Sequence, residues 1–303
     1  MAFLEARNVG MKFKVHGGRA NTLADGREGD TESRRFEADR AGRPIGFHAL
    51  RDISFRLETG ARLALIGANG AGKTTLLEVL SGLLPPTTGE VTHSGDATSL
   101  INIHIGVLPL ASGHRNITLR GLASGKSLEE IEAVRGWIAE FSGLGEFLDM
   151  PFQTYSSGMK MRLKFAIATA FQPDILIMDE WLSAGDAEFR EKATKRMQEI
   201  VERAGILVLA SHSRPLLMRN CSEAIWLDGG RIRERGPVGE VFDAFRETLV
   251  EAGQAGREAA ARQEREDAEA LGLPVSEPAR PGRGKGGGGR KRPDQGPDDA
   301  NGR

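Results

Sequence analysis

The sequence has almost no cysteine, no long hydrophobic run and almost no net charge. Its 303 residues include one cysteine, Cys221, so no internal disulfide can form, which suits a reducing compartment. The longest apolar runs, such as 63–66 and 206–210, are far shorter than the ~18 residues of a membrane-spanning helix. The N-terminus has no long apolar segment after a basic start, so it does not read as a secretory signal. We therefore expect any role at a membrane to depend on a partner protein.

The charge balance also narrows the possible partners. A formal net charge of −1 gives no general electrostatic case for binding nucleic acid, so no nucleic-acid partner is expected. The hydrophobic fraction of 39% and the charged fraction of 27% are ordinary for a soluble globular protein. A chain of this length can bury a full core without disulfides or metal.

Short aliphatic runs alternate with amphipathic stretches along most of the chain, which predicts an α/β fold with a largely parallel sheet. The stretch at about 115–170 is mostly helical in pattern and predicts a helical subdomain. The last hairpin is expected to turn at Asp228-Gly229-Gly230. Strands are expected at 3–9, 53–57, 61–66, 174–178 and 206–210, and helices at 73–83 and 238–250.

Two segments are too polar to order themselves by burying apolar surface. Residues 16–46 have almost no aliphatic side chains and are expected to be a long, mobile loop insertion in a domain that covers 1–250. Residues 251–303 are expected to begin as a charged helix and to end as a disordered tail rich in Gly, Pro and Arg. The basic part of this tail, 280–292, reads as a solvated linker rather than as a tether to nucleic acid or anionic lipid.

A glycine-rich turn follows the expected strand at 61–66. It matches the phosphate-binding pattern G-x-x-x-x-G-K-[ST], and the strand before it and the helix after it argue against a chance match. Glycines let several backbone N–H groups point into one concavity, to which the helix dipole adds positive charge. Lys73 is expected to reach the β- and γ-phosphates of ATP, Thr74 to hold Mg²⁺, and Thr75 to donate to the α-phosphate. The expected nucleotide-binding residues are Gly67, Ala68, Asn69, Gly70, Ala71, Gly72, Lys73, Thr74 and Thr75.

A second site is predicted where an apolar strand ends in two carboxylates, Asp179 and Glu180. The carboxyl ends of parallel strands meet at one edge of the sheet, so these acids are expected to face the glycine-rich turn. Asp179 is then placed to bind Mg²⁺ through its water shell, and Glu180 to act as the general base that polarises the attacking water. A solvated acidic turn is the commoner meaning of such a pair, but the phosphate motif upstream reverses that balance.

Residues 155–159, Tyr-Ser-Ser-Gly-Met, precede an expected helix and resemble the signature Leu-Ser-Gly-Gly-Gln of the ABC (ATP-binding cassette) family. Ser156 matches the signature serine and Gly158 its second glycine, while Ser157 replaces the first glycine. A serine hydroxyl, a glycine and a helix N-terminus together form an anion site. Alone, this pattern more often marks a helix N-cap.

Three further positions follow the family's order of motifs. Asp186, in the run 183–186, resembles the family's D-loop, and His212 resembles the switch histidine that contacts the γ-phosphate and takes part in catalysis with Glu180 and Lys73. Phe13 is the candidate for the aromatic ring that stacks on adenine, although a core phenylalanine explains it equally well. The glutamine that many family members carry between the phosphate helix and the signature is missing from 76–152.

The resemblance covers residues 1–245 and implies a P-loop ATPase with an antiparallel β subdomain and a helical subdomain. It implies that two copies form a head-to-tail dimer, with ATP and Mg²⁺ held between 67–75 of one copy and 156–158 of the other. It also implies an integral-membrane permease as partner, through which a cytoplasmic protein is held at the inner face of the plasma membrane.

The runs 112–117, 155–159 and 179–189 resemble one subfamily, the ATPase subunits of bacterial polysaccharide exporters for capsule, O-antigen and teichoic acid. The implied activity is ATP hydrolysis coupled to outward transport of a polysaccharide or lipid-linked glycan. The alternatives are an ABC ATPase of a lipid or drug exporter and a soluble ABC ATPase without a transport role.

Overall fold

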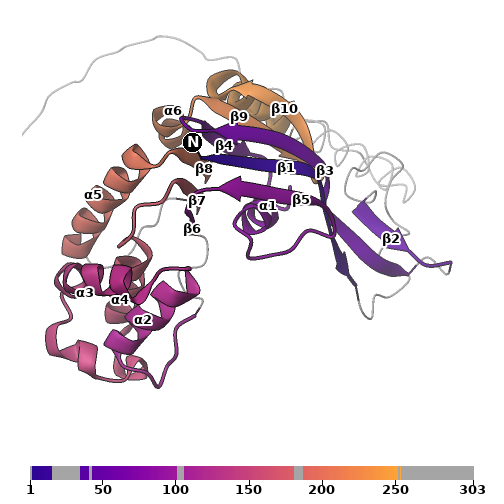
Figure 1. Cartoon of the computed structure of the whole chain (residues 1–303). Helices are drawn as coiled ribbons and strands as arrows, with labels where there is room; N and C mark the ends of the chain where they lie inside the picture. The colour runs from indigo at the N-terminus through magenta and orange to yellow at the C-terminus, as the bar shows by residue number, and fades with distance from the viewer. Residues whose placement is uncertain are drawn as a thin grey trace, which may run out of the picture. The chain divides into compact units, whose positions relative to one another are not determined.

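The structure, a computed structural model, describes residues 2–15, 35–40, 43–100, 106–180, 187–251 and 253. Within these residues the chain forms two β-sheets, with helix α1 (Lys73–Leu80) packed between them, and a separate group of helices (Figure 1). Contacts group the chain up to Leu249 into one compact unit.

The smaller sheet is antiparallel, with strand order β2-β3-β1-β5. Its strands β1 and β3 are longer than the sequence predicts, because each continues past the core toward β2. Their paired register places Phe13 opposite Phe47, and Phe47 opposite Phe36 of β2. The strands are β1 (Phe3–Lys14), β2 (Phe36–Ala38), β3 (Pro44–Glu58) and β5 (Thr88–Ser94).

The larger sheet has strand order β10-β9-β4-β8-β7-β6, and only its β10–β9 pair is antiparallel. The predicted parallel sheet and the predicted hairpin are both confirmed. Its strands are β4 (Arg62–Ile66), β6 (Ala97–Ser99), β7 (Ile175–Asp179), β8 (Ile206–Ala210), β9 (Glu223–Asp228) and β10 (Arg231–Pro237).

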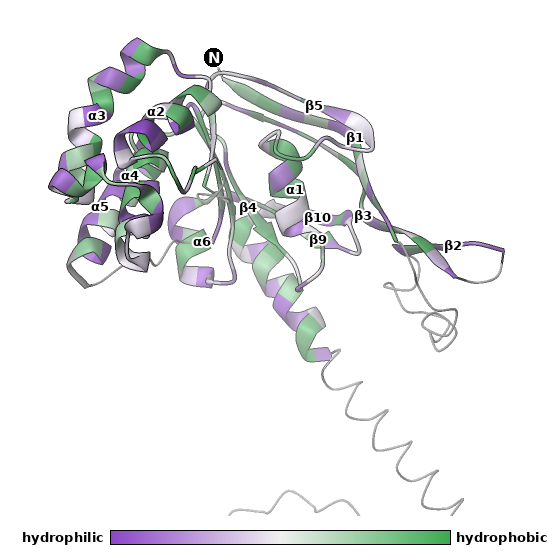
Figure 2. Ribbon diagram, turned by 90° about the horizontal axis from the view of Figure 1, so that it is seen from below, coloured by the Kyte–Doolittle hydropathy of each residue, from purple (hydrophilic) through white to green (hydrophobic). Residues whose placement is uncertain are grey.

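Both faces of the parallel sheet are buried, as expected of strands that read as continuous aliphatic runs. Leu63 and Leu65 of β4 pack with α1 and the antiparallel sheet, whereas Ala64 and Ile66 pack on the opposite face. This alternation follows from the two-residue period of a strand. Figure 2 shows the hydrophobic colouring around β4. The second face is covered by α5 (Ala187–Arg203), α6 (Arg214–Asn220) and a helix that begins at residue 238.

The helical subdomain has a core of its own, in which Ile117, Ile138 and Leu163 are almost completely buried. Its helices start at serine caps, because the Ser112, Ser127 and Ser156 hydroxyls each accept a bond from a backbone N–H in the first turn. The helices are α2 (Gly113–Ala123), α3 (Leu128–Ser142), η3 (Gly145–Asp149), η4 (Phe152–Thr154) and α4 (Ser157–Ala168). Among the residues described, no helix is long and apolar enough to cross a membrane.

The expectation of one mobile loop over 16–46 is wrong for its last part. Residues 36–38 form β2, and β3 begins at Pro44, so the end of the insertion is an antiparallel hairpin. The apolar partner that the sequence reading overlooked is an aromatic one, because the Phe36 and Phe47 rings pack 5.1 Å apart. Residues 16–34 and the predicted tail beyond 253 lie outside the described residues.

Candidate functional site

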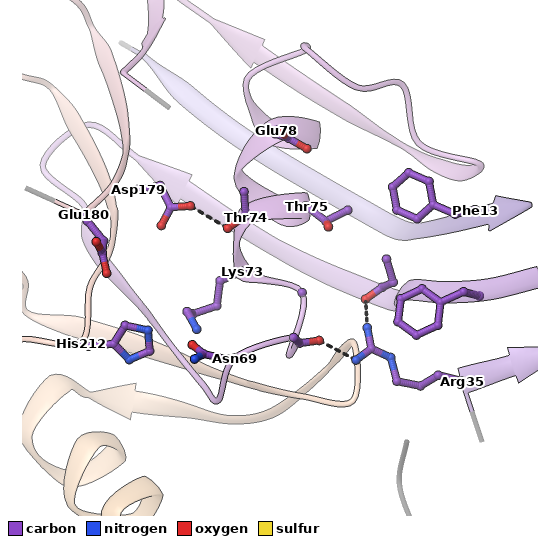
Figure 3. A pocket seen from close by; sticks show the side chains of 14 residues that line it. Phe13, Arg35, Asn69, Lys73, Thr74, Thr75, Glu78, Asp179, Glu180 and His212 are labelled. Atoms are coloured by element: carbon purple, nitrogen blue, oxygen red, sulfur yellow. Dashed lines mark hydrogen bonds between the residues drawn. The ribbon is translucent and has the colours of Figure 1, made fainter. Parts of the chain in front are cut away.

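A pocket of about 630 Å³ opens at the carboxyl edge of the parallel sheet and runs along α1 to the antiparallel sheet (Figure 3). One end holds Lys73, Asp179, Glu180 and His212, and we call it the phosphate end. The other is walled by Phe13, Arg35 and Phe47, and we call it the aromatic end. The remaining lining residues are Ala49, Asn69, Gly70, Gly72, Thr74, Thr75 and Glu78.

The glycine-rich turn connects β4 to α1 as the sequence predicts, and its glycines are required by its shape. Gly72 has a φ of 110° and caps α1, and a Cβ placed there would lie 2.8 Å from the Ala49 carbonyl oxygen. The turn of the β9–β10 hairpin supports it from behind, since the Gly230 N–H donates to the Ala71 carbonyl. This support is not evident in the sequence, because it joins residues far apart in the chain.

Lys73 is a buried cation at the centre of the phosphate end. Its ammonium donates to the carbonyl oxygens of Gly67 at 2.7 Å and Ala68 at 3.1 Å, and the residue is only 9% exposed. Burial lowers the pKa of the Lys73 ammonium below its usual value, and the nearby Asp179 and Glu180 carboxylates oppose that shift. A charge kept out of water in this way is suited to an anionic ligand, which would replace the lost hydration.

Thr74 and Asp179 meet across the pocket, as the two motifs predict. The Thr74 hydroxyl donates to the Asp179 carboxylate at 2.6 Å, although the residues are far apart in the sequence. A hydroxyl and a carboxylate at one point, beside a phosphate-binding turn, are the oxygen ligands that Mg²⁺ prefers. The residues present therefore fit a magnesium ion.

Glu180 lies just past the end of β7 in a backbone conformation that few non-glycine residues adopt. Its φ is 63°, and its N–H donates to the Ala210 carbonyl at 2.8 Å, which ties it to the end of β8. Such left-handed residues cluster at functional sites. His212 is exposed, follows β8, and lines the same end of the pocket (Figure 3).

Phe13 lines the aromatic end, on the opposite side of Thr75 from the phosphate end (Figure 3). Its side chain is 40% exposed, so the core alternative for this residue is wrong. Two other residues at this end, Arg35 and Phe47, were missed. Phe47 had a usable signal, since it precedes the alternating strand 53–57, but Arg35 lies in the segment read as a mobile loop.

The signature turn 156–158 does not line the pocket of its own chain. Ser156 and Ser157 are exposed at the N-terminus of α4, where the Ser156 hydroxyl accepts from the Met159 N–H at 3.2 Å. Asp186 lies outside the described residues. Where the family's glutamine would be sought, Asn116 is fully buried and its amide bonds to the carbonyls of Leu108, Ala111 and Ser112, which fixes that loop.

Comparison with known proteins identifies the family of this chain. Residues 50–183 match the ABC transporter family. The O-antigen export system ATP-binding protein RfbE of Yersinia enterocolitica is 38% identical over 234 residues, which are 77% of this chain and 98% of that protein. The chain belongs to the ABC transporter family. The predicted fold class, with its parallel sheet, antiparallel subdomain and helical subdomain, is confirmed.

Other relatives of this ABC family member are longer proteins. The teichoic acids export ATP-binding protein TagH of Listeria innocua serovar 6a is 42% identical over 201 residues, 66% of this chain and 60% of that protein. The O-antigen export system ATP-binding protein RfbB of Myxococcus xanthus is 40% identical over 201 residues, 66% of this chain and 46% of that protein. The chain thus spans about half the length of these relatives. Their names confirm the resemblance to polysaccharide exporters.

Solved structures agree on the fold. An ATP-binding subunit of an ABC transporter superposes with a TM-score of 0.56 at 22% identity and covers 80% of this chain and 93% of its own. A dimeric post-hydrolysis structure of the ATP-binding cassette MJ0796 with ADP and Pi gives 0.53 at 18% identity, covering 78% and 98%.

Proposed function

We propose that this chain is the ATP-binding and ATP-hydrolysing subunit of an exporter that moves a cell-surface polysaccharide or lipid-linked glycan. The observation that carries the ATPase part is the single pocket that joins a buried Lys73, the Thr74–Asp179 pair and Glu180. A nucleoside triphosphate with its counter-ion matches this arrangement of charge, because the site offers donors for phosphate and acceptors for a cation.

Each residue at the phosphate end then has a role. The backbone N–H groups of 67–75 and the Lys73 ammonium bind the phosphates, and Thr74 and Asp179 hold Mg²⁺. The bound Mg²⁺ supplies charge neutralisation for the transferred phosphoryl group. Glu180 orients the attacking water and takes its proton, and His212 contacts the γ-phosphate. Positioning and charge stabilisation account for catalysis, since no covalent step is required.

The active form is a head-to-tail dimer of two copies of this chain. The Ser156-Ser157-Gly158 turn, whose two serines are exposed, lies at a helix N-terminus, where backbone N–H groups favour an anion. It does not line the pocket of its own chain. We place it against the γ-phosphate bound by the partner copy, with Asp186 at the same interface. ATP binding then closes the dimer, and hydrolysis opens it.

The cargo and the location are proposed from likeness. Proteins named for teichoic acid and O-antigen export match this chain at about 40% identity, so a glycan is the best-supported cargo. The energy of hydrolysis would pass to an integral-membrane permease, which holds this chain at the cytoplasmic face of the plasma membrane.

The ATPase part is tested by measuring phosphate release by the purified full chain with ATP and Mg²⁺. Hydrolysis that requires Mg²⁺ and is lost in Lys73→Ala supports the proposal. A wild-type chain that neither binds nor hydrolyses ATP, alone or with its permease, contradicts it.

The cargo is tested in cells whose only copy of this chain is Glu180→Gln. Glycan is expected to disappear from the cell surface and to accumulate inside, on its lipid carrier. Normal surface glycan together with a defect in lipid or drug efflux would assign the chain to another class of exporter. Normal transport of glycan, lipid and drug alike would contradict a transport role.

A further inference from the structure

The β2–β3 hairpin brings a buried arginine to the nucleotide pocket. Arg35 is 4% exposed, although it stands at the start of the hairpin in a polar segment. Its guanidinium donates three hydrogen bonds to carbonyl oxygens, to His48 at 3.0 Å, Ala49 at 3.1 Å and Gly70 at 2.6 Å. Burial of a charge is costly unless the charge is hydrogen-bonded, and these three bonds meet that need.

The bond to Gly70 reaches into the phosphate-binding turn itself. Gly70 has a φ of 79°, a conformation open mainly to glycine, and a Cβ placed there would meet no atom within 4 Å. The bonds to His48 and Ala49 go to β3, so the guanidinium joins the turn to the antiparallel sheet. Figure 3 shows Arg35 beside the turn, on the side away from Glu180 and His212.

The same guanidinium also supports the aromatic end. Its central carbon lies 4.5 Å from the centre of the Phe47 ring, within the range of a cation–π interaction. Phe47 is the register partner of Phe13 on β1 and of Phe36 on β2, so the three positions are neighbours across the sheet. Arg35 is therefore in contact with both parts of the pocket, the turn that binds phosphate and the ring beside Phe13.

We propose that Arg35 is a positioning residue of the nucleotide site. It fixes the Gly70 carbonyl and the Phe47 ring relative to each other, so that the pocket binds the phosphates and the purine of one nucleotide together. The proposal rests on the proposed ATP-binding function. Arg35 acts through the turn and the ring, because its guanidinium donates to the Gly70 carbonyl and lies over the Phe47 ring. The β2–β3 hairpin is by this account part of the ATP site.

The test measures equilibrium binding of ATP and of inorganic tripolyphosphate to the full chain, together with kcat and KM for ATP. All measurements are made below the melting temperature of each variant, which is determined first. Arg35→Ala is expected to weaken ATP binding about tenfold, the effect of losing one charge-assisted bond, and to weaken tripolyphosphate binding as well. KM is expected to rise more than kcat falls, because Glu180 and Thr74–Asp179 are unchanged.

Arg35→Lys serves where Arg35→Ala does not fold. Lysine keeps the charge but lacks the planar fork that reaches three carbonyls, so it is expected to restore ATP affinity only in part. Arg43→Ala is the matched control. Arg43 is on the same hairpin, exposed and paired with Asp39, and its loss is expected to leave both affinities unchanged.

Two results would overturn the role of Arg35. One is a folded Arg35→Ala or Arg35→Lys with a lowered melting temperature and wild-type affinity for both ligands, which would make Arg35 a stability residue only. The other is an equal loss in Arg43→Ala. Failure of the wild-type chain to bind ATP is a different outcome, since it contradicts the proposed function itself.

Discussion

The phosphate end and the aromatic end of the pocket are built in different ways. Loops that follow parallel strands make the phosphate end, where the sheet brings the ends of β4, β7 and β8 to one edge. The aromatic end is one face of an antiparallel sheet, where side chains meet through register between strands. The first depends on local turns and strand ends, and the second on pairing across the chain.

The two ends therefore differ in their expected roles, catalysis at one and recognition of the base at the other. The phosphate end holds three charged side chains, Lys73, Asp179 and Glu180, which under the proposed function bind and cleave a triphosphate. The aromatic end holds Phe13, Phe47 and the Arg35 guanidinium, which donates to the Gly70 carbonyl. Under the same proposal this end determines which base is bound and in what orientation. Substitutions at the two ends should therefore change different measured quantities.

The largest effect is expected for Glu180→Gln. Loss of the general base should lower the rate of ATP hydrolysis by a factor on the order of 10²–10³ and leave ATP binding intact, so that the variant accumulates as a dimer with bound ATP. Phosphate release and size-exclusion chromatography with ATP measure both effects. Glu58→Gln is the control, because that side chain is 74% exposed on β3. Unchanged turnover in Glu180→Gln would refute its role.

Lys73→Ala should act on binding. The Lys73 ammonium is the buried cation of the phosphate end, and a hydrogen bond to a charged group contributes about 1.5–3 kcal/mol, so affinity should fall at least about tenfold. Titration with a fluorescent ATP analogue measures this loss. Lys195→Ala, on the exposed side of α5, should bind as the wild type does. Wild-type ATP affinity in Lys73→Ala would show that the phosphate end does not bind ATP as proposed.

Phe13→Ala should separate the two ends. Stacking of a base on an aromatic ring contributes about 1–3 kcal/mol, so ATP affinity should fall about tenfold while tripolyphosphate affinity stays the same. Phe36→Ala is the matched control, since Phe36 is similarly exposed and in the same row of rings but does not line the pocket. If both variants lose ATP equally, the aromatic end is not a base site.

The smallest effect is expected on helix caps outside the pocket. Ser127 caps α3 with a complete capping box, and Ser127→Ala should cost about 1 kcal/mol of unfolding free energy without changing hydrolysis.

Ser156→Asp should keep the cap of α4, and thus the stability, yet lower hydrolysis because it adds a negative charge near the partner's phosphate. Chemical denaturation and phosphate release measure the two quantities. Full hydrolysis in Ser156→Asp would count against the dimer site.

The phosphate end was predictable because its information is local. A strand, a glycine turn and Lys73 lie within a few residues of one another, and strand ends in a parallel sheet meet at one edge, which places Asp179 beside Thr74. The ends of the helices and strands were less predictable. Helix α1 ends at Leu80 and not at 83, and β1 continues to Lys14 and does not end at 9.

The aromatic end was only partly predictable because it depends on register. Phe13 was a candidate from the resemblance, but nothing in the sequence shows that β3 begins at Pro44 and brings Phe47 beside it. Arg35 stands among polar residues, and its burial needs the three carbonyls that the folded hairpin provides. Composition favoured a loop there, and tertiary contacts decided otherwise.

A crystal structure of Glu180→Gln with ATP and Mg²⁺ tests the central claim most directly. The account predicts triphosphate oxygens within hydrogen-bond distance of the Lys73 ammonium, Mg²⁺ beside Thr74 and Asp179, the purine against Phe13, and Ser156 of a second copy at the γ-phosphate. A nucleotide bound elsewhere, or with its base and phosphates at exchanged ends of the pocket, would contradict it.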